Sequence, residues 1–185
     1  SEMCIRDRLK HECGMGLVHL KKPLNYYNEK YGSYMYGIDK MFLMMEKQKN
    51  RGQDGAGFAS LKLDLKPGDK YFFRVRSFDQ QAIHSVFRKI NKKITQFLKL
   101  ENVSTNSDEF FKKVPFIGQI MLGHVRYGTY GKNSIDYVHP VMRQNNWMNR
   151  NLILAGNFNM TNNDELFKSL VQLGQHPREQ SDTIT

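Results

Sequence analysis

Apolar residues return every three or four positions in three stretches of the chain. This spacing predicts helices over residues 34–49, 80–100 and 161–174, because side chains so placed share one helix face that a core can cover. The last stretch follows polar capping residues, carries acids in its first turn and ends at Gly174. A further short helix is expected near Glu109.

Shorter apolar runs predict strands, because glycine, proline, asparagine or aspartate bounds them. They cover residues 15–20, 55–63, 71–77, 116–125 and 151–158. The Pro-Gly-Asp turn in "DLKPGDK" joins the second and third runs and predicts a hairpin. Loop signals at Pro23, Asn25 and Gly32 predict a loop over 24–33. This order of elements favours antiparallel or mixed sheets flanked by helices over alternating βαβ units.

The length and composition are those of one ordered globular domain. The chain has 185 residues, of which 39% are apolar and 25% charged, and it shows no repeat or low-complexity stretch. It contains no run of about 18 apolar residues and no secretory signal at its start. We therefore expect a cytoplasmic protein with no membrane segment.

The formal charge of +10 permits a polyanionic partner. Much of the excess lies in "VFRKINKKITQFLKL", where a solvated helix face is the favoured explanation, and no nucleic-acid-binding motif accompanies it. We expect no nucleic-acid partner. The alternative, a nucleic-acid-binding module, predicts strongly salt-dependent binding to any duplex. Rossmann and P-loop fingerprints are also absent from the sequence, which gives no support to a dinucleotide or nucleoside triphosphate site.

Two cysteines, Cys4 and Cys13, both lie in the first 13 residues, so no disulfide framework is expected. Cys13 heads the first predicted strand. A thiolate there could act as a nucleophile, but a lone cysteine at the head of a strand is more often a small buried hydrophobe. Position alone leaves both interpretations open.

Three polar, glycine-rich segments stand where predicted strands begin or end. They are "NRGQDGAG" at 50–57, "GHVRYGTYG" at 123–131 and "AGNFNMTN" at 155–162. Each is either a turn whose glycines supply positive φ or a loop that mounts binding groups.

Taken together with Cys-Gly at 13 and 14 and "SDT" at 181–183, these segments resemble the class II glutamine amidotransferases. "RGQDGAG" at 51–57 and "GHVRYGT" at 123–129 look most like the amidophosphoribosyltransferase branch of that family. The resemblance implies an α+β fold, a four-layer α/β/β/α sandwich of the N-terminal-nucleophile hydrolase type, here incomplete at its C-terminus. Residues 1–12 would be a leader or foreign extension, and 13–185 a truncated glutaminase domain.

By the same resemblance, Cys13 becomes the first residue of the mature chain, and its own α-amine serves as the base for its thiol. A free α-amine has a pKa of about 7.7 to 8.0, which suits proton transfer at neutral pH. While Glu12 remains attached, the nitrogen of Cys13 is an amide and no base. We therefore expect residues 1–12 to be removed and Cys4 to be irrelevant.

The resemblance also implies the remaining site residues. Gly156 and Asn157 would join Cys13 in catalysis, and Arg126 would hold the glutamine α-carboxylate, which a guanidinium can bind bidentately. The other substrate-binding residues would be Thr129 beside Arg126, Asp182 on the α-ammonium, and Arg51 and Gly52 in the turn near the nucleophile. The alternatives are a surface ion pair for Arg126 and a helix cap for Asp182.

The implied activity is hydrolysis of glutamine, with the ammonia used to form phosphoribosylamine in purine biosynthesis. The implied partners are glutamine, a phosphoribosyltransferase domain in cis that this sequence lacks, and further copies of the full-length chain in a homo-oligomer. No metal or other cofactor is expected in this fragment. Mg²⁺ is implied for the absent phosphoribosyltransferase domain.

One departure affects the chemistry directly. The family usually has His-Asn-Gly where this chain has Leu154, Ala155 and Gly156, so the asparagine that contributes to the oxyanion hole is missing. Loss of one such donor typically costs about 10² to 10³ in rate unless another group replaces it. Asn157, Asn159 or the Gly156 N–H could do so. The alternative function is a catalytically degenerate glutaminase-fold domain with a regulatory or scaffolding role.

Overall fold

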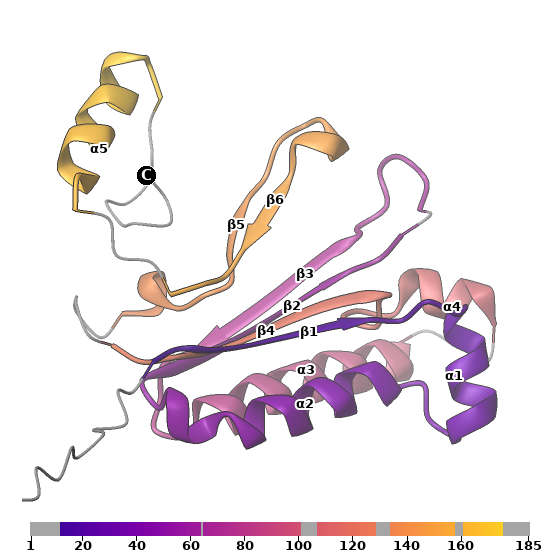
Figure 1. Ribbon diagram of the computed structural model, residues 1–185. Coiled ribbons are helices and arrows are strands. Elements are labelled where there is room, and N and C mark those ends of the chain that lie inside the picture. The colour runs from indigo at the N-terminus through magenta and orange to yellow at the C-terminus, as the bar shows by residue number, and fades with distance from the viewer. Residues whose placement is uncertain (1–11, 64, 101–106, 129–133, 158–160, 176–185) are drawn as a thin grey trace, which may run out of the picture.

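A four-stranded antiparallel sheet organises the computed structural model, which describes residues 12–63, 65–100, 107–128, 134–157 and 161–175. The strand order is β1-β4-β2-β3 (Figure 1). The bounds are Gly14–His19 for β1, Gly55–Leu61 for β2, Phe72–Ser77 for β3 and Ile120–Arg126 for β4. A separate two-stranded antiparallel hairpin is formed by β5, Val141–Arg143, and β6, Leu152–Leu154.

Two long helices, α2 (Tyr36–Lys47) and α3 (Ala82–Leu100), cover one face of the four-stranded sheet (Figure 1). Their buried apolar side chains recur at the spacing expected from the sequence. These are Ile38, Met41 and Met45 on α2, and Ile83, Val86, Phe87, Ile90 and Ile94 on α3. The main hydrophobic core therefore lies between these helices and the sheet.

Shorter helices complete the described chain. The α-helices are α1 (Leu24–Tyr31), α4 (Asp108–Lys113) and α5 (Asn163–Gln172), and the 3₁₀ turns are η1 (Lys49–Arg51), η2 (Ile135–Tyr137) and η3 (Met148–Arg150). No helix within the described ranges combines the length and apolarity needed to cross a bilayer.

The opposite face of the sheet carries a strap, residues 138–140, which leads into β5. Arg76 donates from Nη1 to the Val138 carbonyl at 2.9 Å, and Arg74 donates to the Pro140 carbonyl at 3.4 Å. A Cβ added at Gly57 would lie 2.0 Å from the His139 carbonyl oxygen, so the strap rests on the main chain of β2. Farther along this face, Met15 and Leu17 of β1 stay 51% and 64% exposed.

The mixed architecture agrees with the α+β expectation, and the antiparallel sheet, the 55–77 hairpin and the three main helices are confirmed. The described residues show one helix layer, one sheet and a hairpin. The four-layer sandwich therefore stays a prediction.

The expected loop over 24–33 is wrong, because residues 24–31 form α1. Pro23 and Gly32 act as the helix boundaries: Pro23 is the N-cap, and Gly32 closes the helix in the left-handed region at φ 68°. Tyrosines of α1 stack on Tyr36 of α2 and so stabilise the helix, with the Tyr31 and Tyr36 ring centroids 4.2 Å apart.

Candidate active site

The strand ladder brings Cys13 opposite Arg126. In the β1–β4 pairing Gly14 faces Val125, and one further step in the same register places Cys13 across from Arg126. Opposed residues of an antiparallel pair project to the same side, here the face that α2 and α3 leave open. The Cys13 thiol accepts a hydrogen bond from the Tyr127 N–H at 3.4 Å and lies 3.8 Å from the Tyr127 carbonyl. A half-buried thiol is thus fixed at the end of the sheet.

The turn from Gly52 to Asp54 clamps the end of β4. The Asp54 N–H donates to the Arg126 carbonyl at 3.0 Å, and the Gly128 N–H donates to Asp54 Oδ2 at 2.8 Å. A Cβ at Gly52 would lie 2.6 Å from the Arg126 carbonyl carbon, so only glycine fits this approach. Arg51 points elsewhere and pairs with Glu12 at 3.4 Å, with both side chains about half exposed.

Arg126 is buried, with 6% of its surface exposed. Its guanidinium lies close to Gly128, where an added Cβ would be 3.0 Å from Nη1. This burial argues against the surface ion pair considered from the sequence. A buried guanidinium on the residue across the ladder from Cys13 suits an anionic substrate group, since a fixed, weakly hydrated cation can bind a carboxylate bidentately.

Two histidines, His124 of β4 and His139 of the strap, meet on the open face of the sheet. The rings of His124 and His139 are 4.8 Å apart. Burial, followed by the repulsion that a proton on His139 would exert, lowers the pKa of His124 to about 3, although the Gly156 carbonyl acts in the opposite direction. Burial also lowers the pKa of His139, where the Gly156 carbonyl again opposes the shift and the charges of Arg126 and Arg76 add to it. Both imidazoles are therefore neutral near pH 7.

Gly156 joins the site through His139. Its carbonyl oxygen is 2.8 Å from His139 Nδ1, and its own nitrogen is 3.3 Å from the same atom. Gly156 is buried, whereas Asn157, the next residue, is exposed. Ala155 offers no side-chain hydrogen-bond donor, so the donors at positions 155 and 156 are main-chain N–H groups.

The structure thus gathers Cys13, Arg126 and Gly52 at one end of the sheet, with Arg51 near Glu12, while Gly156 contacts the strap that crosses the same face. Thr129, Asp182 and Asn159 lie outside the described residues, as does Cys4. The sequence marked His124 only as part of "GHVRYGT", and nothing in it distinguished His139 from an ordinary loop residue.

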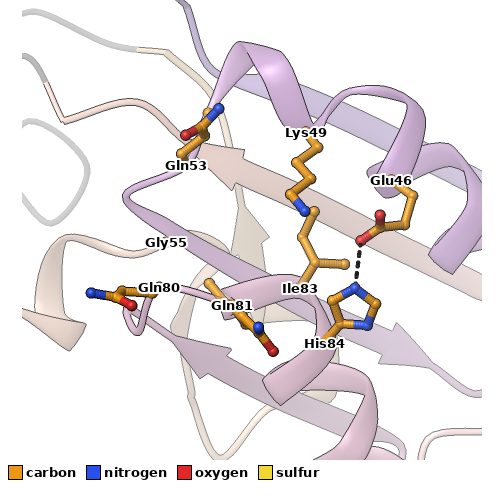
Figure 2. A pocket seen from close by; sticks show the side chains of 10 residues that line it. Glu46, Lys49, Gln53, Gly55, Gln80, Gln81, Ile83 and His84 are labelled. Carbon is orange, nitrogen blue, oxygen red and sulfur yellow. Dashed lines mark ion pairs between the residues drawn. The ribbon is translucent and has the colours of Figure 1, made fainter.

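A small pocket lies behind the 52–55 turn, between the end of α2 and the start of α3 (Figure 2). Glu46, Lys49, Gln53 and Gln81 are among its lining residues, and His84 Nε2 is 3.6 Å from Glu46 Oε1. Its volume of about 40 Å³ has room for a few water molecules. Across the described ranges, no cluster of three or more His, Cys, Asp or Glu side chains is arranged to hold a metal ion.

Comparison with known proteins gives two partial similarities. The chain is 34% identical over 84 residues to an amidophosphoribosyltransferase of Lacticaseibacillus casei, a match that covers 45% of this chain and 41% of the relative. The match thus spans less than half of the relative's length.

A solved structure, described as the allosteric regulatory enzyme of purine biosynthesis, aligns with 92% of this chain and 27% of its own. Its sequence identity is 22% and its TM-score 0.49. No family model matches the chain. As its motifs predicted, this chain is similar in sequence to amidophosphoribosyltransferase.

Proposed function

We propose that this chain carries the glutamine-hydrolysing part of an amidophosphoribosyltransferase. The observation that carries the proposal is the juxtaposition at the end of the sheet: a thiol hydrogen-bonded to the Tyr127 main chain, in register with a buried guanidinium. A thiol supplies the nucleophile for acyl transfer, and a guanidinium supplies the anchor for an amino-acid carboxylate.

In the proposed reaction, the Cys13 thiolate attacks the side-chain amide carbon of glutamine. The tetrahedral intermediate expels ammonia and leaves a glutamyl thioester, which water hydrolyses to glutamate and free thiol. The proton taken from the thiol passes to the leaving nitrogen. Because the described contacts of the Cys13 thiol are to the Tyr127 main chain, the α-amine of Cys13 itself is the proposed carrier of this proton, which requires removal of Glu12 and everything before it.

Substrate recognition is divided among the other predicted residues. Arg126 binds the α-carboxylate, and the turn at Gly52 fixes the strand end that presents it. Thr129 and Asp182, the latter on the α-ammonium, belong to the proposal through the resemblance alone. The Gly156 N–H and Asn157 are the proposed donors to the oxyanion, because Ala155 cannot serve.

The wider proposal concerns the whole protein. Residues 13–185 form a glutaminase domain of the four-layer type, and a phosphoribosyltransferase domain in cis receives the ammonia, which displaces pyrophosphate from phosphoribosyl pyrophosphate. Mg²⁺ acts in that second domain. The full-length protein is cytoplasmic and a homo-oligomer.

The test is glutamine hydrolysis by the full-length protein, compared with the Cys13→Ala and Cys4→Ala variants. We expect Cys13→Ala to abolish hydrolysis and Cys4→Ala to leave it unchanged. Synthesis of phosphoribosylamine from ammonium salts should survive both substitutions. Glutamine hydrolysis that persists in Cys13→Ala refutes the proposal. Wild-type protein that uses ammonium and never glutamine supports the degenerate-domain alternative instead.

A further inference from the structure

The His139 ring contacts both main-chain polar atoms of Gly156, the carbonyl oxygen and the amide nitrogen. Its Nδ1 is 2.8 Å from the Gly156 oxygen and 3.3 Å from the Gly156 nitrogen. A neutral imidazole nitrogen is either a donor or an acceptor, so one ring atom cannot make both hydrogen bonds at once. The tautomer of His139 therefore decides which group of Gly156 is engaged.

The two tautomers have opposite consequences. With the proton on Nδ1, the ring donates to the Gly156 carbonyl and leaves the Gly156 N–H available to another acceptor. With the proton on Nε2, the bare Nδ1 accepts from the Gly156 N–H and occupies it. The 2.8 Å contact has the length of a good N–H···O bond, whereas the 3.3 Å contact is longer than the usual range, which favours the first tautomer.

Resting on the proposed function, we propose that His139 is a positioning residue, whose Nδ1–H holds the Gly156 carbonyl and so keeps the Gly156 N–H free to donate to the glutamine oxyanion. An oxyanion hole commonly has a second donor, from the backbone or from a side chain, that shares that task. Here Ala155 provides none, so the orientation of one backbone amide carries more of the stabilisation.

The surroundings of His139 suit this role. Its carbonyl rests on Gly57 of β2, and the carbonyls of its neighbours Val138 and Pro140 accept hydrogen bonds from Arg76 and Arg74. The charged and titratable groups that influence the ring are His124, Arg126 and Arg76, and they disfavour a second positive charge there. A neutral ring is thus held in one place above β4.

The first test reads the tautomer directly and needs no activity. The ¹⁵N chemical shifts of labelled histidine in the full-length protein separate protonated from bare ring nitrogens, and the signals missing in His139→Asn identify the ring of interest. We expect a protonated Nδ1 and a bare Nε2 at pH 7. A bare Nδ1 overturns the proposal.

The second test uses two matched substitutions. In His139→Asn the side-chain amide nitrogen can occupy the position of Nδ1, whereas in His139→Gln it reaches the position of Nε2. We expect His139→Gln to lower kcat for glutamine hydrolysis by about 100-fold with KM little changed, because a small misplacement of a donor is felt mainly in the transition state. His139→Asn should restore kcat to within about fivefold of wild type.

Ammonium-dependent synthesis and the melting temperature should be the same in both variants, which separates positioning from loss of folding. Equal kcat values in His139→Asn and His139→Gln, or a change in KM alone, overturn the positioning role. Wild-type protein that hydrolyses no glutamine refutes the proposed function, and the tautomer measurement then still decides the hydrogen bond between His139 and Gly156.

Discussion

The end of the sheet that presents Cys13 and Arg126 is built from main-chain contacts, whereas the segment that presents Gly156 is attached to the same face through side chains. Strand β4 is paired on both sides, and the 52–54 turn adds a hydrogen bond and a close packing contact to its last residue. Gly156 follows a three-residue strand and contacts the imidazole of His139. The proposed nucleophile and carboxylate anchor are therefore specified by register, and the proposed oxyanion donor by individual side chains.

This difference explains how far each region could be predicted. The ladder region is encoded locally: glycines mark the turn, alternation marks the strands, and "GHVRYGT" spans the end of β4. The predicted strand over 151–158 shortened to Leu152–Leu154, and β5 was not foreseen, because three-residue strands leave almost no alternating pattern. His139 was missed because its role depends on a strap folding back across β2, a contact far from local in sequence.

The same reasoning applies to α1. Its aromatic and polar residues have little amphipathic pattern, and proline and glycine usually mark turns, so a loop was the natural expectation. Only packing against Tyr36 shows that Pro23 and Gly32 enclose a helix.

The largest effect on substrate binding is expected at Arg126, the proposed anchor for the substrate carboxylate. We expect Arg126→Gln to lower kcat/KM for glutamine by about 100-fold or more, because two charge-assisted hydrogen bonds to the substrate carboxylate are lost. The exposed Arg143→Gln serves as the matched control and should leave kcat/KM unchanged. Steady-state kinetics of the full-length protein measure both. A wild-type value in Arg126→Gln would remove this residue from the proposed site.

The next largest effect is expected at the turn from Gly52 to Asp54, which holds the end of β4. Gly52→Ala places a methyl group 2.6 Å from the Arg126 carbonyl carbon, which forces the turn away from β4. We expect a loss of about 1 to 3 kcal/mol in the free energy of unfolding, measured with urea. Gln53→Ala, at the exposed neighbouring position, should cost less than about 0.5 kcal/mol. Equal losses in the two variants would show that the turn is not tightly held.

Acid should lower the free energy of unfolding through the buried histidines His124 and His139. The pKa of His124 is about 3 in the folded state and ordinarily 6.5, so between these values the unfolded chain binds a proton that the native chain does not. Stability is then complete above pH 6.5 and falls as the pH drops towards 3, by about 2 kcal/mol at pH 5 from this group. His139, whose pKa is also lowered, acts in the same direction.

Urea unfolding at pH 5 and pH 7 tests this dependence. His124→Gln should reduce the difference in stability between the two pH values, whereas the exposed His19→Gln should preserve it. A pH dependence unchanged by His124→Gln would show that this imidazole is not buried in its neutral form.

The smallest effect is expected at Arg51. Its ion pair with Glu12 is about half exposed at both ends, so solvent screens it, and Arg51→Ala should change the free energy of unfolding by less than about 1 kcal/mol. Glu12→Gln provides the partner variant, and unfolding of both, in uncleaved chain that still carries residue 12, measures the pair. A larger loss would mean that this contact stabilises the start of β1.

The central claim is that Cys13, with its amino group freed, is the nucleophile that attacks glutamine. The most direct measurement is peptide mapping by mass spectrometry after the purified full-length protein reacts with a glutamine analogue that carries a chloroketone in place of the amide. The account predicts one label, on the Cys13 sulfur of a chain that begins at Cys13, and predicts that excess glutamine prevents it. A label on Cys13 still joined to Glu12, or no label that glutamine blocks, would contradict it.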